Sequence, residues 1–188
     1  MKLYTKNGDD GGTGLLFGKK ISKADSRTEA YGSLDSAISA MGLARSLVSD
    51  LNVKEILLSL QMELFTVGSE LATPPADLEK LKTHYSVVTP EMVQTIEDHI
   101  DDFSAKVKLP RAFIVPGASP GSGAIDLARS LVRTAERRAV GLKDDEELPN
   151  PEVIKYLNRL SDLLFILARY EDRDLPADLT TGERVSLG

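Results

Sequence analysis

Four arginines lie within ten residues in the second half of this chain. Arg129, Arg133 and Arg137 are spaced four residues apart, so on a helix their guanidinium groups line one face, and Arg138 adds a charge beside them. Like charges at this spacing repel one another unless an anion lies between them. A polyphosphate suits such planar, permanently charged donors. A surface face balanced by neighbouring acids would show the same pattern, so the spacing alone leaves both interpretations open.

A glycine-rich segment near the N-terminus is the second candidate for chemistry. Five glycines lie between Gly8 and Gly18, with Thr13 and several lysines among or beside them. Backbone N–H groups in such a segment can approach phosphate oxygens, because no Cβ stands in the way. It is not a Walker A loop, since five residues rather than four separate Gly12 from Gly18 and a second lysine follows Lys19. The segment is either a phosphate-binding segment or a flexible arm.

A polar pair and a lone histidine complete the candidates. Asn158 and Asp162 lie one turn apart in an otherwise apolar stretch, where they need partners, either in a structural network or on a ribose or purine. His99 lies among acids, but the Glu-x-x-His spacing of di-iron bundles is missing because Ile96 stands at the required position. A solvated acidic helix face accounts for His99 better than a metal site.

Helices must position these groups, because apolar residues recur at helical spacing in five stretches. The stretches cover residues 26–51, 53–72, 89–103, 120–140 and 150–170, and the third and fifth begin with a cap residue followed by proline. Strand signals are few. We therefore expect an all-α fold, an antiparallel five-helix bundle forming one domain over residues 1–172. Residues 1–24 form its N-terminal segment, and the polar residues 173–188 form a flexible tail.

Composition and charge narrow the function further. The chain has 188 residues, of which 41% are hydrophobic and 28% charged, as in ordinary globular proteins. Its net charge of −6 does not indicate binding to nucleic acid or to an anionic membrane. The longest apolar run, residues 163–168, is too short to cross a bilayer, and no signal peptide is visible. No cysteine is present, which excludes disulfides and thiol nucleophiles. We expect a cytoplasmic protein.

Taken together, these segments resemble the PduO-type ATP:corrinoid adenosyltransferases. The resemblance extends from Tyr4 to about Tyr170, and no single segment of it is decisive. The matching segments occur in the family's order: Tyr-Thr-Lys-x-Gly-Asp at residues 4–9; Lys23-x-Asp25; Ala30-Tyr31-Gly32-x-x-Asp35; Phe113-Ile114-Val115-Pro116-Gly117; Ala128-Arg129, then Arg133-x-Ala135-Glu136-Arg137; and Asn158-Arg159-Leu160-Ser161-Asp162.

The resemblance implies a homotrimer with active sites between subunits, in which the N-terminal segment orders over ATP. Phe113 matches the aromatic residue at the corrin site, where it helps to exclude the lower axial base. Asp35 and Arg129 match a pair that bridges adjacent subunits. The residues expected to contact ATP by position are Thr5, Lys6, Asn7, Gly8, Thr13, Gly14, Lys23, Arg133, Thr134, Ala135, Glu136, Arg137 and Asn158. Magnesium is expected on the ATP phosphates without side-chain ligands.

The sequence also departs from the family pattern. Thr134 stands where many members have a second consecutive arginine, and Asp126 where many have histidine. Two serines flank Asp35. Ser33 stands where threonine or glutamate is usual, and Ser36 stands where glutamate is usual.

The implied reaction transfers the 5′-deoxyadenosyl group of ATP to cobalt in cob(I)alamin or a related reduced corrinoid, releasing triphosphate. Cobalt is the nucleophile and carries no proton, so no catalytic histidine or cysteine is needed. Arg133, Arg137 and Lys23 would stabilise the departing triphosphate, and Phe113 would favour four-coordinate cobalt. A reductase and an adenosylcobalamin-dependent enzyme are the expected transient partners. The alternatives are a non-catalytic escort or sensor of ATP and corrinoid, or a structural bundle with a flexible arm.

Overall fold

Local capping signals set where the long helices begin in the computed structural model, which describes Tyr4 and residues 6–188. Asp25, Asp50, Thr89 and Ser119 each precede a helix and accept hydrogen bonds from backbone N–H groups of its first turn. Proline follows Thr89 and Ser119 at the first helical position. Asn150 accepts from the backbone N–H of Glu152 and so starts the last helix. The long helices are α1 (Ser26–Leu47), α2 (Leu51–Leu71), α4 (Pro90–Ser104), α5 (Pro120–Asp144) and α6 (Glu152–Glu171).

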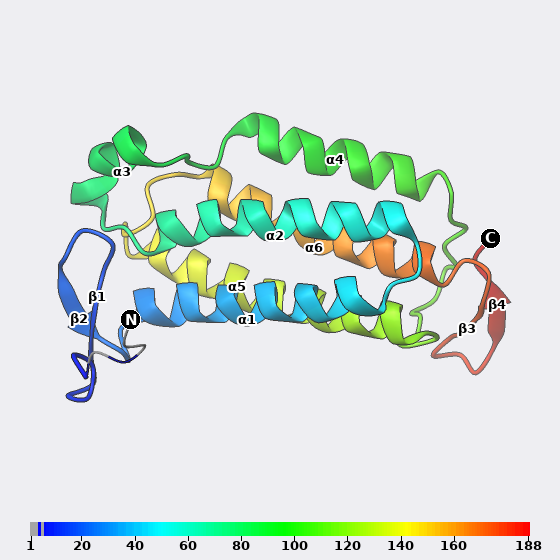
Figure 1. Ribbon diagram of the computed structural model, residues 1–188. Coiled ribbons are helices and arrows are strands. Elements are labelled where there is room, and N and C mark those ends of the chain that lie inside the picture. Colours follow the sequence, from blue (N-terminus) through cyan, green and yellow to red (C-terminus); the bar gives the residue numbers. More distant parts are fainter. Residues whose placement is uncertain (1–3, 5) are drawn as a thin grey trace.

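The long helices lie side by side and run along a common direction (Figure 1). Helix α1 packs against α2 and α5, α5 packs against α6, and α4 covers α6 from outside. Alanines allow α1 and α5 to approach closely, because they add little bulk between the backbones. The buried alanines are Ala30, Ala37, Ala40 and Ala44 on α1, and Ala124, Ala128, Ala135 and Ala139 on α5. The predicted all-α character is confirmed, with helices close to the predicted ranges.

The connection after α2 differs from the prediction, which has no helix there. A 3₁₀ turn, η1 (Pro75–Asp77), leads into a short helix, α3 (Leu78–His84), so the described part of the chain holds six α-helices. Leu81 of α3 is fully buried. The segment is too short for its apolar spacing to stand out in the sequence, and burial of one leucine is what holds it on the bundle.

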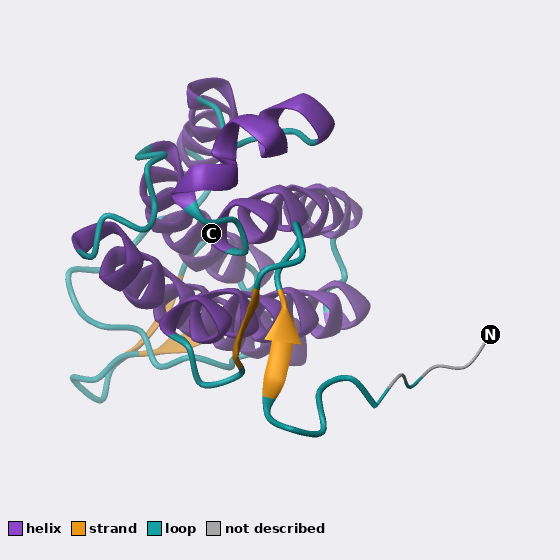
Figure 2. Ribbon diagram, turned by 90° about the vertical axis from the view of Figure 1, so that its left-hand side faces the viewer, coloured by secondary structure: helices purple, strands orange, loops and turns teal. Residues whose placement is uncertain are grey.

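Two short β-hairpins lie at opposite ends of the helices (Figures 1 and 2). Strands β1 (Gly12–Gly14) and β2 (Lys20–Ser22) pair near the start of α1, and β3 (Pro176–Asp178) and β4 (Arg184–Ser186) pair near its end. The second hairpin corrects the prediction that residues 173–188 form a flexible tail without regular structure. Ala177, Leu179 and Leu187 are buried, and this contact with the bundle is not visible in the polar composition of the segment.

A buried carboxylate ties three elements together at one end of the bundle. Glu70, near the end of α2, is 2% exposed, and its Oε1 accepts a hydrogen bond of 2.6 Å from the backbone N–H of Val88. The Asn150 side chain donates from Nδ2 to both Glu70 oxygens. Burial raises the pKa of Glu70, and the bonds from Val88 and Asn150 oppose that shift. Glu70 therefore fixes the starts of α4 and α6 relative to α2.

Arg27 performs a similar task beside the N-terminal hairpin. Its buried guanidinium donates to the carbonyl oxygens of Leu71 and Thr73 at 2.8 Å, and to the Glu147 carboxylate at 2.7 Å. These bonds join the start of α1 to the end of α2 and to the connection between α5 and α6.

Within the described residues, no helix is long and apolar enough to cross a membrane.

Candidate functional site

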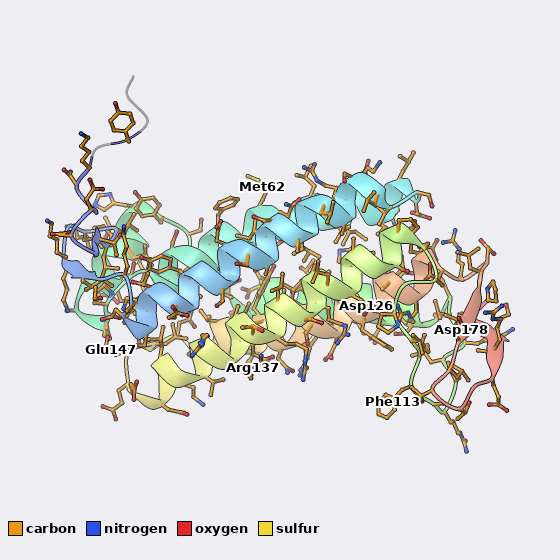
Figure 3. The ribbon with its side chains drawn as sticks, turned by 90° about the horizontal axis from the view of Figure 1, so that it is seen from below. Met62, Phe113, Asp126, Arg137, Glu147 and Asp178 are labelled. Atoms are coloured by element: carbon orange, nitrogen blue, oxygen red, sulfur yellow. The ribbon has the colours of Figure 1, made fainter. Side chains whose placement is uncertain are left out.

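The polar face of α5 carries two uncompensated arginines. Arg133 and Arg137 are exposed, whereas Ala135 between them is buried against the core. Arg137 donates only to the Thr134 hydroxyl at 3.0 Å, and Figure 3 shows it pointing away from the bundle. Among the residues that the structure describes, Arg133 has no hydrogen-bond or ion-pair partner. Because no acid among the described residues forms an ion pair with these two guanidinium groups, the α5 face can receive an anion, which favours the polyphosphate interpretation.

The third arginine of the series, Arg129, is engaged by a buried acid. Its Nε donates to Oδ1 of Asp126 at 2.9 Å, one turn earlier on α5. The other Asp126 oxygen accepts from Nη2 of Arg169 on α6, and both of these side chains are almost fully buried. Asp126 thus directs the Arg129 side chain and leaves its terminal nitrogens available. Arg169 was not among the predicted site residues, although an arginine in the apolar run of α6 is a visible signal in the sequence.

A hydrogen-bonded chain connects α4, α6 and α5 next to the two exposed arginines. Asn158 donates from Nδ2 to Oε1 of Glu136 at 3.0 Å, and its Oδ1 accepts from Nη1 of Arg159 at 2.7 Å. Arg159 in turn donates from Nε to Glu97 on α4 at 2.8 Å. The Asn158 amide therefore has a fixed orientation, with one N–H and one lone pair still free for a ligand. Asp162, its predicted companion, is exposed and lines a polar groove together with Arg159 and Glu97.

The glycine-rich segment folds into a tight loop ahead of β1. Lys23 donates from Nζ to the Gly8 carbonyl at 2.8 Å, and its backbone N–H donates to the Gly11 carbonyl at 2.9 Å. A Cβ on Gly8 would lie 3.0 Å from Nζ of Lys23 and 3.1 Å from the Gly12 carbonyl oxygen, so a larger residue would crowd this point. Gly11 has a φ of 82°, which favours glycine for a different reason.

The remaining predicted ATP contacts of this segment lie around the same loop. Lys6, Asn7 and Gly14 are exposed and Thr13 is half-buried, whereas Thr5 lies outside the described residues. The chain before β1 leads away from the helices in Figure 2. The hairpin itself is anchored by buried Leu15 and by Lys80 of α3, whose Nζ lies 4.5 Å from the centre of the Phe17 ring.

Phe113 lies at the other end of the bundle. Its side chain is 83% exposed and borders a hollow of about 440 Å³ that Arg111, Thr180 and Thr181 also line. Figure 3 shows Phe113 pointing outward beside the C-terminal hairpin. Helix α1, which separates this end from the glycine-rich segment, has 22 residues and is therefore about 33 Å long. Phe113 and the glycine-rich segment of one chain thus cannot line the same small site.

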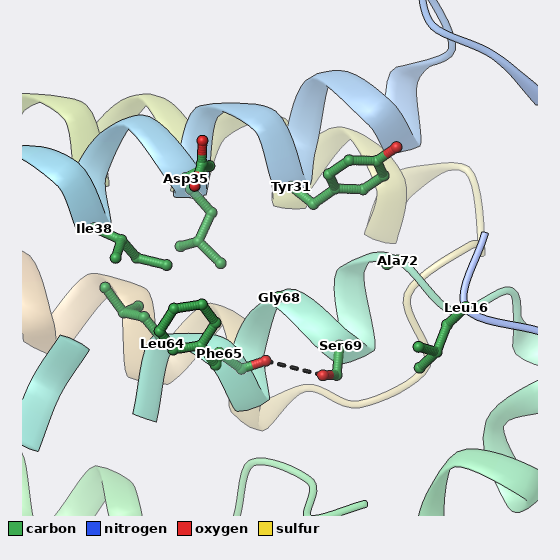
Figure 4. Close-up of a pocket in the computed structure, with 10 residues that line it drawn as sticks. Leu16, Tyr31, Asp35, Ile38, Leu64, Phe65, Gly68, Ser69 and Ala72 are labelled. Carbon is green, nitrogen blue, oxygen red and sulfur yellow. Dashed lines mark hydrogen bonds between the residues drawn. The ribbon is translucent and has the colours of Figure 1, made fainter. Parts of the chain in front are cut away.

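Asp35 borders a third hollow, of about 270 Å³, between α1 and α2. Tyr31 and Asp35 of α1 face Phe65 and Ser69 of α2 across it, and Leu16 closes it from the N-terminal hairpin (Figure 4). Asp35 is exposed. Within the described residues of one chain, it makes no ion pair with Arg129. In a single chain, Asp35 is therefore exposed, whereas Arg129 is held by Asp126 and is 26% exposed.

Three comparisons with known proteins bear on this geometry. The sequence model of the cobalamin adenosyltransferase family matches residues 3–171. The corrinoid adenosyltransferase of Mycobacterium tuberculosis is 37% identical over 179 residues, covering 92% of this chain and 90% of the relative. The corrinoid adenosyltransferase PduO of Salmonella typhimurium is 37% identical over 174 residues, which cover 93% of this chain. This chain spans about half, 51%, of the length of that PduO protein.

A solved structure shows the same fold. It is that of a variant PduO-type ATP:corrinoid adenosyltransferase from Lactobacillus reuteri, complexed with cobalamin and ATP. Its sequence is 35% identical to this one, the match covers 90% of each chain, and the TM-score is 0.83.

Proposed function

The chain belongs to the cobalamin adenosyltransferase family, and we propose that it transfers the 5′-deoxyadenosyl group of ATP to the cobalt of cob(I)alamin or a related reduced corrinoid. The products are adenosylcobalamin and triphosphate. The observation that carries the proposal is the α5 face beside the oriented Asn158–Glu136 pair, where Arg133 and Arg137 have no acidic partner in the described part of the chain. This face offers two cations and an amide to one elongated anionic ligand.

The reaction needs positioning and charge stabilisation rather than proton transfer. Cobalt(I) attacks the 5′ carbon, the bond from that carbon to the phosphate oxygen breaks, and its electron pair leaves with triphosphate. Negative charge grows on the leaving group, so donors already aimed at it lower the barrier. Arg133 and Arg137 are suited to that task because their guanidinium groups remain charged and exposed. Holding carbon and cobalt in line supplies the rest.

The glycine-rich segment is proposed to close over ATP, with residues 5–8, Thr13, Gly14 and Lys23 as its contacts. Lys23 holds the loop through the Gly8 and Gly11 carbonyls, so it would shape the segment as well as supply charge. Magnesium is proposed to arrive on the ATP phosphates, whose charge it neutralises when bound. Among the described residues, no group of three or more His, Cys, Asp or Glu side chains could hold a metal ion.

A homotrimer with sites between subunits is part of the proposal. The glycine-rich segment and Phe113 lie at opposite ends of one chain, so a second copy must bring one of them to the other (Figure 3). Helix α2 also exposes an apolar stripe at helical spacing, which marks an interaction surface. The stripe consists of Leu51, Leu58, Met62 and Phe65. Asp35 and Arg129 would then meet across the subunit boundary.

We propose that Phe113 forms an apolar wall of the corrin site and excludes water and the lower axial base from cobalt. An 83% exposed phenylalanine at the rim of a hollow is costly to leave in water, and a flat apolar ligand would cover it. Cobalt(II) that lacks an axial ligand is easier to reduce.

The cytoplasm is the proposed location, since a chain without cysteine suits a reducing compartment. A reductase and an adenosylcobalamin-dependent enzyme are its proposed transient partners.

The test is a single-turnover assay with purified protein, MgATP and chemically reduced cobalamin, followed by the absorbance change on cobalt alkylation. We expect adenosylcobalamin and triphosphate in equal amounts, and neither product without ATP. A protein that binds ATP and cobalamin yet alkylates no cobalt would be an escort or sensor, and the proposed activity would be wrong.

A further inference from the structure

The loop that carries Phe113 is paired with the C-terminal hairpin through main-chain hydrogen bonds. Val115 donates its backbone N–H to the Asp178 carbonyl at 2.8 Å, and Thr180 donates to the Phe113 carbonyl at 3.0 Å. Ile114 and Leu179 lie opposite each other between these two bonds, as an antiparallel pair. The loop thus forms an isolated antiparallel bridge with the residue that follows β3.

This pairing decides which way Phe113 points. Successive side chains of a strand face opposite sides, so neighbours of an inward residue must face outward. Ile114 is partly buried against the core, opposite buried Leu179, which leaves Phe113 and Val115 on the outer side. A shift of one residue in the register would turn Phe113 inward and Ile114 into solvent. The hairpin therefore holds the register that exposes Phe113.

The hairpin is itself firmly placed on the bundle. Leu187 is fully buried, and its carbonyl accepts a hydrogen bond of 2.8 Å from the Lys108 backbone N–H, just before the Phe113 loop. Ala177, 1% exposed, pairs with Val185 across the two strands. These contacts attach the hairpin to the core and to the segment just before the loop. It also lies beyond residue 171, where the match to the family model ends.

We propose that the C-terminal hairpin is a positioning element of the corrinoid site, and that the Thr180 backbone N–H acts through Phe113. The inference rests on the role of Phe113 in the proposed function. The hairpin turn also contributes Thr180 and Thr181 to the hollow beside Phe113, so the same segment supports the apolar wall and forms part of its rim. Loosening the hairpin would let Phe113 leave its outward position and let a ligand reach cobalt.

A single substitution can remove one of the two bonds without disturbing the turn. Gly182 donates to the Leu179 carbonyl at 2.9 Å, which makes Thr180 the second residue of a β-turn. Neither Thr180 nor Thr181 has a positive φ, whereas Gly182 has a φ of 86°, as in a type I turn followed by a left-handed glycine. Proline is favoured at the second position of this turn. Thr180→Pro therefore deletes the N–H, and Thr180→Ala is the matched control that keeps it.

The experiment compares these two variants with the wild type in three measurements. In Thr180→Pro we expect a lower four-coordinate fraction of bound cob(II)alamin and adenosylation from cob(II)alamin slowed on the order of 2- to 10-fold, the effect of one main-chain hydrogen bond. The KM for ATP should not change. The Val115 amide should exchange its hydrogen faster than in Thr180→Ala. Thr180→Ala should keep the wild-type exchange rate at Val115 and the wild-type KM for ATP. Because Thr180 also lines the hollow, the cob(II)alamin effects of Thr180→Pro are measured relative to Thr180→Ala, which loses the same side chain.

A double-mutant cycle shows whether Thr180 acts through Phe113. In a Phe113→Ala background, Thr180→Pro should slow the reaction no further, because there is no aromatic wall left to position. An equal loss in both backgrounds would overturn the inference, as would equal Val115 exchange in the two Thr180 variants. Should Thr180→Pro fail to fold, Leu179→Ala, which removes the side chain opposite Ile114, must show the same cob(II)alamin defect or the inference fails.

Failure of the proposed function would look different. A wild-type protein that alkylates no cobalt overturns that function whatever the variants do. The Val115 exchange rates do not depend on activity and would still show whether the hairpin holds the loop.

Discussion

Replacing Asp126 by asparagine removes the charge that two arginines share, with almost no change in shape. The Asp126 and Arg169 side chains are 4% and 2% exposed. After the substitution, the guanidinium of Arg169 would remain buried without a counter-charge, and its Nε already has no hydrogen-bond partner. Its other neighbour is the ring of Phe165, 5.3 Å from Cζ. Arg129, which is 26% exposed, would lose the acceptor that directs its side chain.

The expected loss of stability is large. Breaking a buried ion pair on one side costs about 3–5 kcal/mol, because the remaining charge is stranded in a medium of low polarity. For a chain of this size, each kcal/mol lowers Tm by about 2–4 °C, so Asp126→Asn should lower Tm by roughly 6–20 °C. Asp178→Asn is the matched control. It also removes an aspartate from a close arginine pair, but Asp178 and Arg184 are 57% and 66% exposed, so water replaces the lost partner.

Urea denaturation followed by circular dichroism measures both variants. We expect the midpoint to fall clearly for Asp126→Asn and to change little for Asp178→Asn, with unchanged slopes. The double variant Asp126→Asn/Arg169→Met should recover part of the loss, because the stranded charge is then gone. If the two asparagine variants are equally stable, or if the double variant recovers nothing, charge burial is not the reason that Asp126 matters.

The remaining predictions concern the site and the pH dependence of stability. Arg133→Ala should lower kcat on the order of 10²-fold or more in steady-state assays; a rise confined to the KM for ATP would make Arg133 a ground-state contact instead. Arg159→Met should raise the KM for ATP more than it lowers kcat, since the Asn158 amide then keeps only its bond to Glu136 and is oriented less well; an unchanged KM would contradict a positioning role. Asp35→Arg and Arg129→Asp should each impair corrinoid use, and mixing the two variants should restore activity once subunits exchange; exchange without recovery would place the bridge elsewhere. The pKa of Glu70 is raised in the folded protein, so Glu70 contributes fully to stability at pH values below its pKa in the unfolded chain. That contribution is lost as the pH rises through its pKa in the folded protein. Wild type should therefore lose stability relative to Glu70→Gln over that pH range, and a difference independent of pH would refute the assignment.

The sequence by itself determined the helices and one face of the site. Cap residues and apolar spacing located the five long helices within a few residues, because both signals act through neighbours one turn away. The four-residue spacing of Arg133 and Arg137 placed them on one face by helix geometry alone. The order of the family motifs led to the proposed reaction. All of these signals are local, or are matched one segment at a time.

Only the tertiary structure decided which of these groups are free and which are engaged. The spacing grouped Arg129 with its two neighbours, but Asp126 holds it, and Asp126 in turn is paired with a residue 43 positions further along the chain. Asn158 could have been structural or functional, and the packing of α5, α6 and α4 gave it the partners that orient it.

The C-terminal residues show the same division most clearly. They are polar and without periodicity, so the sequence predicted a flexible tail. In the structure, Ala177 and Leu187 pack in the hydrophobic core, and the hairpin pairs with the Phe113 loop. A partner more than sixty residues away cannot be read from local spacing, since it is packing that brings the two segments together. The outward direction of Phe113 follows from that pairing, through the alternation of side chains along a strand.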